Sequence, residues 1–174
     1  MDSYLKLAKT AVAKYIKEGV VISPPKKLSR GMQKKAGVFV SIYKNARGLP
    51  LRGCIGTFLP TQENIACEII RNAIASACND PRFEPIKKDE LKNLIYSVDI
   101  LSAQKNVIKF NDLDAKRYGL IVSTSDGRRG LLLPDIAGVR TTEEQIAICR
   151  LKAGISPSEK IKLQTFTVER HEEK

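Results

Sequence analysis

Three stretches of the chain repeat their apolar residues at intervals of three and four positions, which is the spacing of one helix face. They cover residues 3–18, 61–79 and 142–153. The middle stretch is rich in isoleucine and alanine, which form a wide apolar stripe. We therefore expect three helices that each bury one face.

Residues suited to capping mark the ends of these helices. Asp2 or Ser3 precedes the first helix and Gly19 ends it, while Thr61 stands before the second. Thr141 to Glu144 form a capping box that opens the third helix. The same logic predicts a short helix that begins at residues 156–159, and another short helix is expected around 89–93.

Other segments alternate apolar and polar residues, as strands with one buried face do. The alternation predicts two hairpins, 37–44 with 51–58 and 118–124 with 130–134, and single strands over 95–101 and 164–170. The strands occur singly or in hairpins, without regular strand–helix–strand alternation. The sequence therefore predicts a mixed α+β fold with a largely antiparallel sheet flanked by helices.

One predicted strand, LRGCIGTF, carries two glycines, although glycine weakens a strand unless something approaches the backbone closely. Alternation places Arg52, Cys54 and Gly56 on one face and Gly53 on the other. A guanidinium beside a thiol favours the reactive thiolate, and Gly56 leaves a recess for a small anionic group or an extended backbone. The alternative interpretation is that Cys54 is a buried packing residue and that the glycines allow tight packing or a bulge.

Composition bounds the class of protein. The 174 residues are 43% hydrophobic and 28% charged, which is typical of one globular domain. No apolar run approaches the roughly 18 residues of a membrane helix, and lysines interrupt the N-terminal segment where a signal peptide would be apolar. We expect a cytoplasmic protein that does not bind membranes.

The chain has four cysteines, no C-x-x-C pair, and one histidine, His171, near its end. This set does not favour a structural zinc site or a catalytic triad built on histidine. Cys67, Cys78 and Cys149 fall within predicted helices and are interpreted as packing residues. The sequence identifies no cofactor.

The net charge is +11, which favours anionic partners. Basic residues gather in 24–35 and in the pairs Lys87-Lys88 and Arg128-Arg129. They accompany no zinc finger, RNA-recognition signature or nucleotide-binding loop. A solvated basic surface is therefore preferred over a nucleic-acid footprint.

Several segments together resemble the AMMECR domain family, protein A of the AmmeMemoRadiSam system. They are LRGCIGTF, NDPRFEPI with ELKNL, YGLIVS with GRRGLLLP, and CRLKAGI, in this order between about residues 37 and 155. The resemblance implies a single domain over 1–174 with a larger and a smaller lobe around a cleft, and the R-G-C-I-G strand near that cleft. It also implies Memo-like and radical S-adenosylmethionine proteins as partners.

The family motifs map onto three groups of residues in this chain. The first is Arg52, Gly53, Cys54 and Gly56, with Cys54 and Arg52 as candidate catalytic residues. Asp80 and Arg82 form the second group, and Arg128 and Arg129 belong to the third; all four are candidate binding residues. Asp80 and Arg82 also suit a helix-to-loop junction, and Arg128 and Arg129 suit an exposed turn.

Three classes of function remain open. The preferred one is an enzyme or enzyme component with its site at the R-G-C-I-G strand. The second is an adaptor that binds a peptide or a protein without catalysis. The third is a nucleic-acid-binding protein that uses the basic segment, for which a steep loss of affinity with salt is expected.

Overall fold

The structure is a computed structural model that describes residues 2–173. The chain divides into two compact units. The first comprises residues 2–101 together with 169–173, and the second comprises residues 102–168. Each unit has its own sheet and its own hydrophobic core, so each buries apolar surface by itself.

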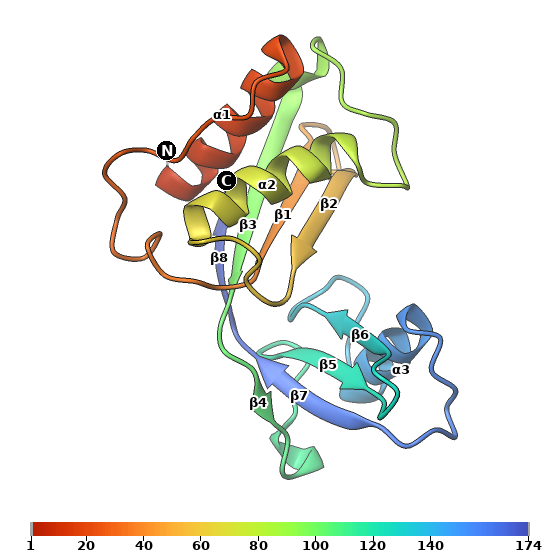
Figure 1. The fold of residues 1–174 in the computed structure, drawn as a ribbon. Coiled ribbons are helices and arrows are strands. Elements are labelled where there is room, and N and C mark those ends of the chain that lie inside the picture. The colour runs from red at the N-terminus through yellow and green to blue at the C-terminus, as the bar shows by residue number, and fades with distance from the viewer. Residues whose placement is uncertain (1, 174) are drawn as a thin grey trace. The chain divides into compact units, whose positions relative to one another are not determined.

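The first unit combines a four-stranded sheet with two helices (Figure 1). The strand order is β2-β1-β3-β8, and β1 pairs antiparallel with both β2 and β3. The helical segments are α1 (Ser3–Glu18), α2 (Ile65–Cys78) and the 3-10 helix η1 (Glu90–Asn93). The strands are β1 (Val38–Lys44), β2 (Leu51–Thr57), β3 (Leu94–Leu101) and β8 (Val168–Glu172).

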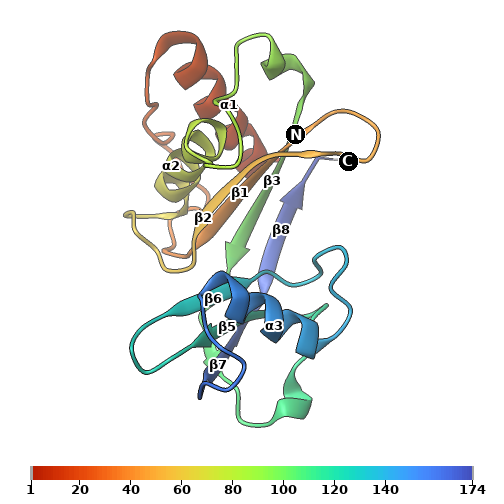
Figure 2. The ribbon, with the colours of Figure 1, turned by 90° about the vertical axis from the view of Figure 1, so that its right-hand side faces the viewer.

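Helices α1 and α2 lie on the same side of this sheet (Figure 2). Every second residue of β1, namely Val38, Val40 and Ile42, is fully buried and belongs to the core beneath the helices. The residues between them point to the opposite side, because successive side chains of a strand alternate. Neither helix covers that opposite side, so this unit has a sheet face on which polar side chains can gather.

Helix α1 begins and ends as the sequence predicts. The Asp2 carboxylate accepts hydrogen bonds from the backbone N–H groups of Tyr4 and Leu5, and Gly19 ends the helix with φ of 71°. Asp2 also contacts the last strand, because His171 Nδ1 lies 3.0 Å from Asp2 Oδ2 and the His171 ring stacks on Tyr4. The final strand is therefore attached to the start of α1.

Helix α2 begins three residues later than predicted. Its N-cap is Asn64, whose side-chain oxygen accepts from the Cys67 N–H, and the prediction of Thr61 as the cap was wrong. The backbone N–H and the hydroxyl of Thr61 instead donate to the Glu68 carboxylate. Thr61 therefore binds the buried Glu68 carboxylate instead of capping the helix. The capping pattern in the sequence does not reveal this interaction.

The second unit has the strand order β4-β7-β5-β6 and one helix, α3. Its core lies between α3 and one face of the sheet and includes Leu120, Val122, Leu132 and Cys149. The α3 capping box between Thr141 and Glu144 is present as predicted. The elements are β4 (Lys105–Asn106), η2 (Phe110–Asp112), β5 (Gly119–Ser123), β6 (Arg129–Leu132), α3 (Thr142–Lys152) and β7 (Lys162–Phe166).

Two predictions for the C-terminal part were wrong. Residues 156–159 form a turn, because the Glu159 carboxylate that was expected to cap a helix also binds Arg128. The strand expected over 164–170 is interrupted at Thr167, whose carbonyl accepts from the Ser102 backbone N–H and whose N–H donates to the Ser102 hydroxyl. The two parts belong to different sheets as β7 and β8, although the alternation of the sequence continues through the break. The mixed α+β class with antiparallel pairing is confirmed.

The basic segment before β1 lies at the surface, with the side chains of Lys26, Lys27, Lys34 and Lys35 exposed. Replacing these four lysines with serine is expected to change the free energy of unfolding by less than about 0.5 kcal/mol per site, because exposed substitutions rarely do more. Urea denaturation measures this change. Met32→Ser in the same segment is the matched control, because Met32 is 4% exposed and its loss should cost about 2–5 kcal/mol. A similar loss in the lysine variant would contradict a solvated surface.

Candidate functional site

Strand β2 carries the R-G-C-I-G motif, and its first glycine makes room for α2. A Cβ atom on Gly53 would lie 2.0 Å from the backbone carbonyl oxygen of Ser76. No side chain fits at that distance, and the atom in the way belongs to a helix backbone that cannot rotate aside. Gly53 therefore allows α2 to lie directly on the strand.

Polar residues four positions apart on α2 face the strands at this contact. The Glu68 carboxylate accepts from the Thr57 hydroxyl, and the Asn72 amide donates to the Val38 carbonyl. The Ser76 hydroxyl accepts from the backbone N–H of Ile55. Since residues four apart share one helix face, Glu68, Asn72 and Ser76 form a buried polar stripe that binds β1 and β2. The sequence analysis recognised only the apolar stripe of this helix.

Asp80 continues this stripe just beyond the end of α2. Its carboxylate accepts a hydrogen bond of 2.8 Å from the backbone N–H of Cys54 and is bound by the Arg82 guanidinium at 2.8 and 3.0 Å. Asp80 is 4% exposed. The hydrogen bonds from Arg82 hold the pKa of Asp80 well below its usual range despite burial. The two predicted residues Asp80 and Arg82 are thus brought next to Cys54.

Cys54 points to the side of the sheet that carries no helix. It is half-buried, and the Ser41 hydroxyl donates to its Sγ atom at 3.2 Å. Burial raises the pKa of Cys54, which the hydrogen bond from Ser41 and the charge of Arg82 only partly offset. This direction is opposite to the one expected from an arginine beside the thiol.

Strand pairing places further polar residues beside Cys54. Ser41 lies opposite Cys54 on one side and opposite Ser97 on the other, so the three form a row across β2, β1 and β3. Tyr43 follows on the same face, where burial raises its pKa and Ser41, Cys54 and Asp99 influence it. The Asp99 carboxylate is in turn bound by the Arg170 guanidinium.

We refer to this side of the sheet as the polar face. It is defined by Ser41, Tyr43, Cys54, Ser97, Asp99 and Arg170. The sequence analysis missed all of these except Cys54. Their signal was the alternation itself, because SIY in 41–43 and SVD in 97–99 place polar side chains opposite the apolar core positions.

Arg52 is not part of the polar face, and its expected proximity to Cys54 was wrong. Ile42 pairs with Gly53 but Tyr43 pairs with Leu51, so Arg52 is an extra residue in a β-bulge. A bulge redirects its side chain, and simple alternation no longer applies. The Arg52 guanidinium binds the Glu90 carboxylate at 2.8 and 2.9 Å and the Glu84 carbonyl at 2.8 Å.

The recess expected over Gly56 is occupied. Phe39 lies opposite Gly56 on β1, and a Cβ atom on Gly56 would lie 2.2 Å from the Phe39 ring. Gly56 therefore accommodates an aromatic side chain of the neighbouring strand. An open groove of about 610 Å³ lies instead at the start of β2, with a lining that includes Arg52, Arg82, Phe83 and Pro85.

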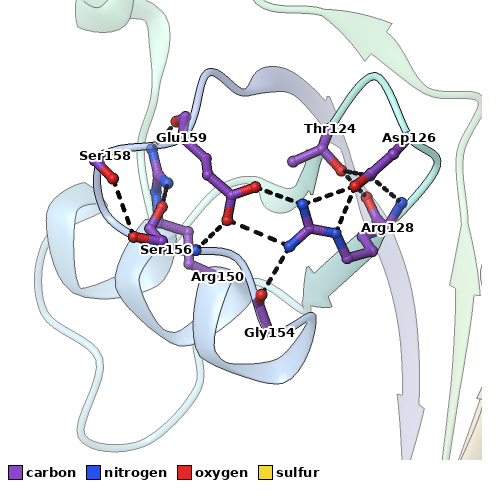
Figure 3. A network of polar contacts seen from close by, with 8 residues as sticks. All are labelled: Thr124, Asp126, Arg128, Arg150, Gly154, Ser156, Ser158 and Glu159. Atoms are coloured by element: carbon purple, nitrogen blue, oxygen red, sulfur yellow. Dashed lines mark hydrogen bonds and ion pairs between the residues drawn. The ribbon is translucent and has the colours of Figure 1, made fainter.

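Arg128, in the second unit, is the centre of an ion-pair network (Figure 3). Its guanidinium binds the carboxylates of Asp126 and Glu159 and donates to the Gly154 carbonyl at 2.8 Å. These contacts join the β5–β6 turn to the loop after α3. Every nitrogen of the guanidinium has a protein partner, which is the arrangement of a structural residue.

Arg129 lies in a different environment. It is exposed at the start of β6 and lines a groove of about 830 Å³ together with Ser123 and Lys162. Ser123 pairs with Arg129 on β6 and with Lys162 on β7, so these three residues form a row across the sheet. Arg128 and Arg129 are therefore adjacent in sequence but occupy separate settings within the second unit.

No group of three or more histidine, cysteine, aspartate or glutamate side chains within residues 2–173 is arranged to hold a metal ion. No helix in the same range has both the length and the apolar character that a membrane crossing requires.

The architecture is that of a mixed α+β protein with two antiparallel sheets. The sequence matches the model of the AMMECR1 family over residues 5–171, and the chain belongs to this family. A crystal structure of an uncharacterised protein from Pyrococcus horikoshii superposes with a TM-score of 0.88 at 34% identity, covering 98% of this chain and 90% of that one. The resemblance inferred from the motifs is confirmed.

Relatives from bacteria are more similar in sequence. A protein from Thermotoga maritima is 46% identical over 170 residues, which are 97% of this chain and 96% of that protein. A protein from Clostridium acetobutylicum is 44% identical over 174 residues, which are 99% of this chain but 36% of that protein. A region similar to this chain thus forms one part of that longer protein.

Proposed function

We propose that this protein is a cytoplasmic component of an enzyme system and that Cys54 is its reacting group. The observation that carries the proposal is the composition of the polar face. A thiol, a hydroxyl and a phenol meet there on three neighbouring positions of two strands.

The geometry defines the resting state of this group. Burial keeps the pKa of Cys54 raised, so the residue rests as a thiol, and Ser41 holds its sulfur in place. Arg82 is the cation whose charge favours the thiolate once the proton leaves. Arg82 is itself held in position by the buried Asp80. Cys54 is therefore the candidate catalytic residue, and Asp80 and Arg82 position and tune it.

The chain supplies only part of a catalytic apparatus in this proposal. The nearby carboxylates, Asp80 and Asp99, are each already bound by an arginine guanidinium. A thiol of raised pKa needs a base or an activated substrate to react. We therefore propose that a partner supplies the remaining groups, and the family resemblance points to Memo-like and radical S-adenosylmethionine proteins. Co-purification with tagged candidates tests this part.

A binding module is the second candidate function. The groove beside Arg52 and Arg82 favours it, because apolar residues such as Phe83 and Pro85 alternate there with charged ones. Such a lining suits a peptide better than a small reactive molecule. A protein partner that binds equally well to the parent and to Cys54→Ser would favour this alternative.

Alkylation of Cys54 tests the proposed role. We expect iodoacetamide to label Cys54 in the folded protein with an apparent pKa above the value of about 8.5 for a free thiol, because burial outweighs the nearby cation. Arg82→Gln should raise this pKa further, since it removes the cation. Arg52→Gln is the matched control and should leave it unchanged, since Arg52 binds Glu90. Mass spectrometry across a pH series measures each cysteine separately.

Two results would contradict the proposed role of Cys54. If Cys54 reacts only after denaturation, it is a packing residue and the proposed function is wrong. If Arg52→Gln shifts the pKa of Cys54 as much as Arg82→Gln does, then Arg82 is not the cation that acts on the thiol.

A further inference from the structure

Two arginines flank the polar face in the same way. Arg82 is bound by Asp80, and Arg170 is bound by Asp99, each through its Nε and Nη2 atoms. The carboxylate side chains are 2% and 5% exposed, while those of Arg82 and Arg170 are 56% and 32% exposed. Each pair therefore buries its negative end and presents its positive end to the outside.

The arginines retain the capacity to bind another group. The Nη1 atoms of Arg82 and Arg170 make no hydrogen bond with any residue in the range 2–173. The guanidinium is a planar fork that binds carboxylate and phosphate oxygens strongly. Because the buried aspartates already fix its orientation, little side-chain freedom remains to be lost on binding.

Neutral hydrogen-bond donors lie between the two arginines. Cys54 and Tyr43 both have raised pKa values and keep their protons at neutral pH. Tyr43 is near enough to Arg170, and Cys54 to Arg82, for the charges to affect them. Strand order places Arg82 beyond the β2 side of the row and Arg170 on β8 at the other edge. Oxyanion groups at the two edges of the row would therefore meet one guanidinium each.

We propose that the polar face binds a ligand with carboxylate or phosphate oxygens, anchored by Arg82 and Arg170. This inference rests on the site of the proposed function and names its substrate class. The ligand lies over Cys54 and Ser41, so that its oxyanion groups are held by the arginines while its remaining part faces the thiol.

Protection of Cys54 from iodoacetamide tests the inference. Citrate and inorganic pyrophosphate are the probes for the carboxylate and phosphate forms, and sodium chloride at equal ionic strength is the reference. We expect at least one probe to slow the labelling of Cys54 in a saturable manner and to leave Cys67 and Cys78 unaffected. The probe that protects at the lower concentration identifies the form of oxyanion.

Paired substitutions show which residues hold the anion. Asp99→Asn with Arg170→Met, and Asp80→Asn with Arg82→Met, remove each arginine without leaving a buried charge alone. Each pair should weaken protection by about tenfold, the value of one lost charge-assisted hydrogen bond. Lys14→Met with Glu18→Gln removes an exposed ion pair on α1 and is the matched control, with protection unchanged.

Calorimetry with Cys54→Ser separates this inference from the proposed function. If the probe binds this variant while Cys54 of the parent never reacts in the folded state, the anion site stands and the catalytic role fails. If Cys54 reacts but neither probe protects it or binds, the anion site is wrong and the catalytic role stands. Protection that survives both paired substitutions also overturns the anion site.

Discussion

Gly53→Ala is expected to lower the free energy of unfolding by about 2–3 kcal/mol, near the upper end of the usual cost of overpacking. The added methyl group would meet the Ser76 carbonyl oxygen at 2.0 Å, and that oxygen belongs to the backbone of α2. Relief requires a shift of the whole helix away from β2. Such a shift also stretches the hydrogen bond between the Ser76 hydroxyl and the Ile55 N–H. Urea denaturation of the variant and the parent measures the loss.

Gly56→Ala is the matched comparison on the same strand. Its methyl group would meet the Phe39 ring at 2.2 Å and the Phe39 Cα atom at 2.6 Å, so shortening the side chain removes only part of the obstacle. We expect Phe39→Ala to recover part of the loss in Gly56→Ala, whereas Ser76→Ala should recover none of the loss in Gly53→Ala. Recovery in the second case would show that the obstacle is a side chain and would contradict the close approach of the helix backbone.

These two glycines show what the motif reveals by itself. A glycine inside a predicted strand indicates that another part of the chain lies close to the backbone. This is confirmed at Gly53, where the backbone of α2 lies against the strand. The identity of the neighbour depends on which helix crosses the strand, and on which residue of β1 lies opposite Gly56. Both depend on tertiary structure, which a local sequence pattern does not reveal. The second unit has the same arrangement of a strand glycine beneath a helix backbone, because Gly130 on β6 lies beneath the Cys149 carbonyl of α3.

The elements themselves were predictable where local chemistry determines them. Asp2 and Gly19 limit α1, and the capping box of Thr141 opens α3, because both signals act within a few residues. Thr61 misled because its partner, Glu68, is fixed by the packing of α2 on the sheet. The start of α2 therefore depends on the packing of Glu68, a member of the buried polar stripe, and not on the local capping pattern alone.

The candidate site was less predictable than the fold, since its membership depends on register. One bulge at Arg52 moved a predicted catalytic residue away from Cys54 and left Arg82 as the nearby cation. Arg170 lies more than a hundred positions from Cys54 in the sequence and reaches the polar face only because β8 returns to the first sheet. A periodic pattern marks the face of each strand but not which strands are neighbours.

Arg52→Met is expected to lower the free energy of unfolding by about 3 kcal/mol at neutral pH, because it leaves a partner of a largely buried ion pair alone. The Arg52 and Glu90 side chains are 9% and 24% exposed, and the guanidinium also binds the Glu84 carbonyl. The substitution therefore removes the contacts that join β2 to η1 and to the Glu84 carbonyl. Lys14→Met, which breaks an exposed pair, is the control and should cost less than about 0.5 kcal/mol.

The pH dependence of this difference identifies the ion pair as its cause. The hydrogen bonds from Arg52 lower the pKa of Glu90 from 4.5 to about 2 in the folded protein. A lowered folded pKa gives stability that is present above the unfolded value and is lost as the pH falls through the folded one. The difference between parent and Arg52→Met should thus be full above pH 4.5 and shrink towards pH 2. Urea denaturation at several pH values measures it, and a difference that stays constant over this range would assign the loss to packing of the Arg52 side chain rather than to its charge.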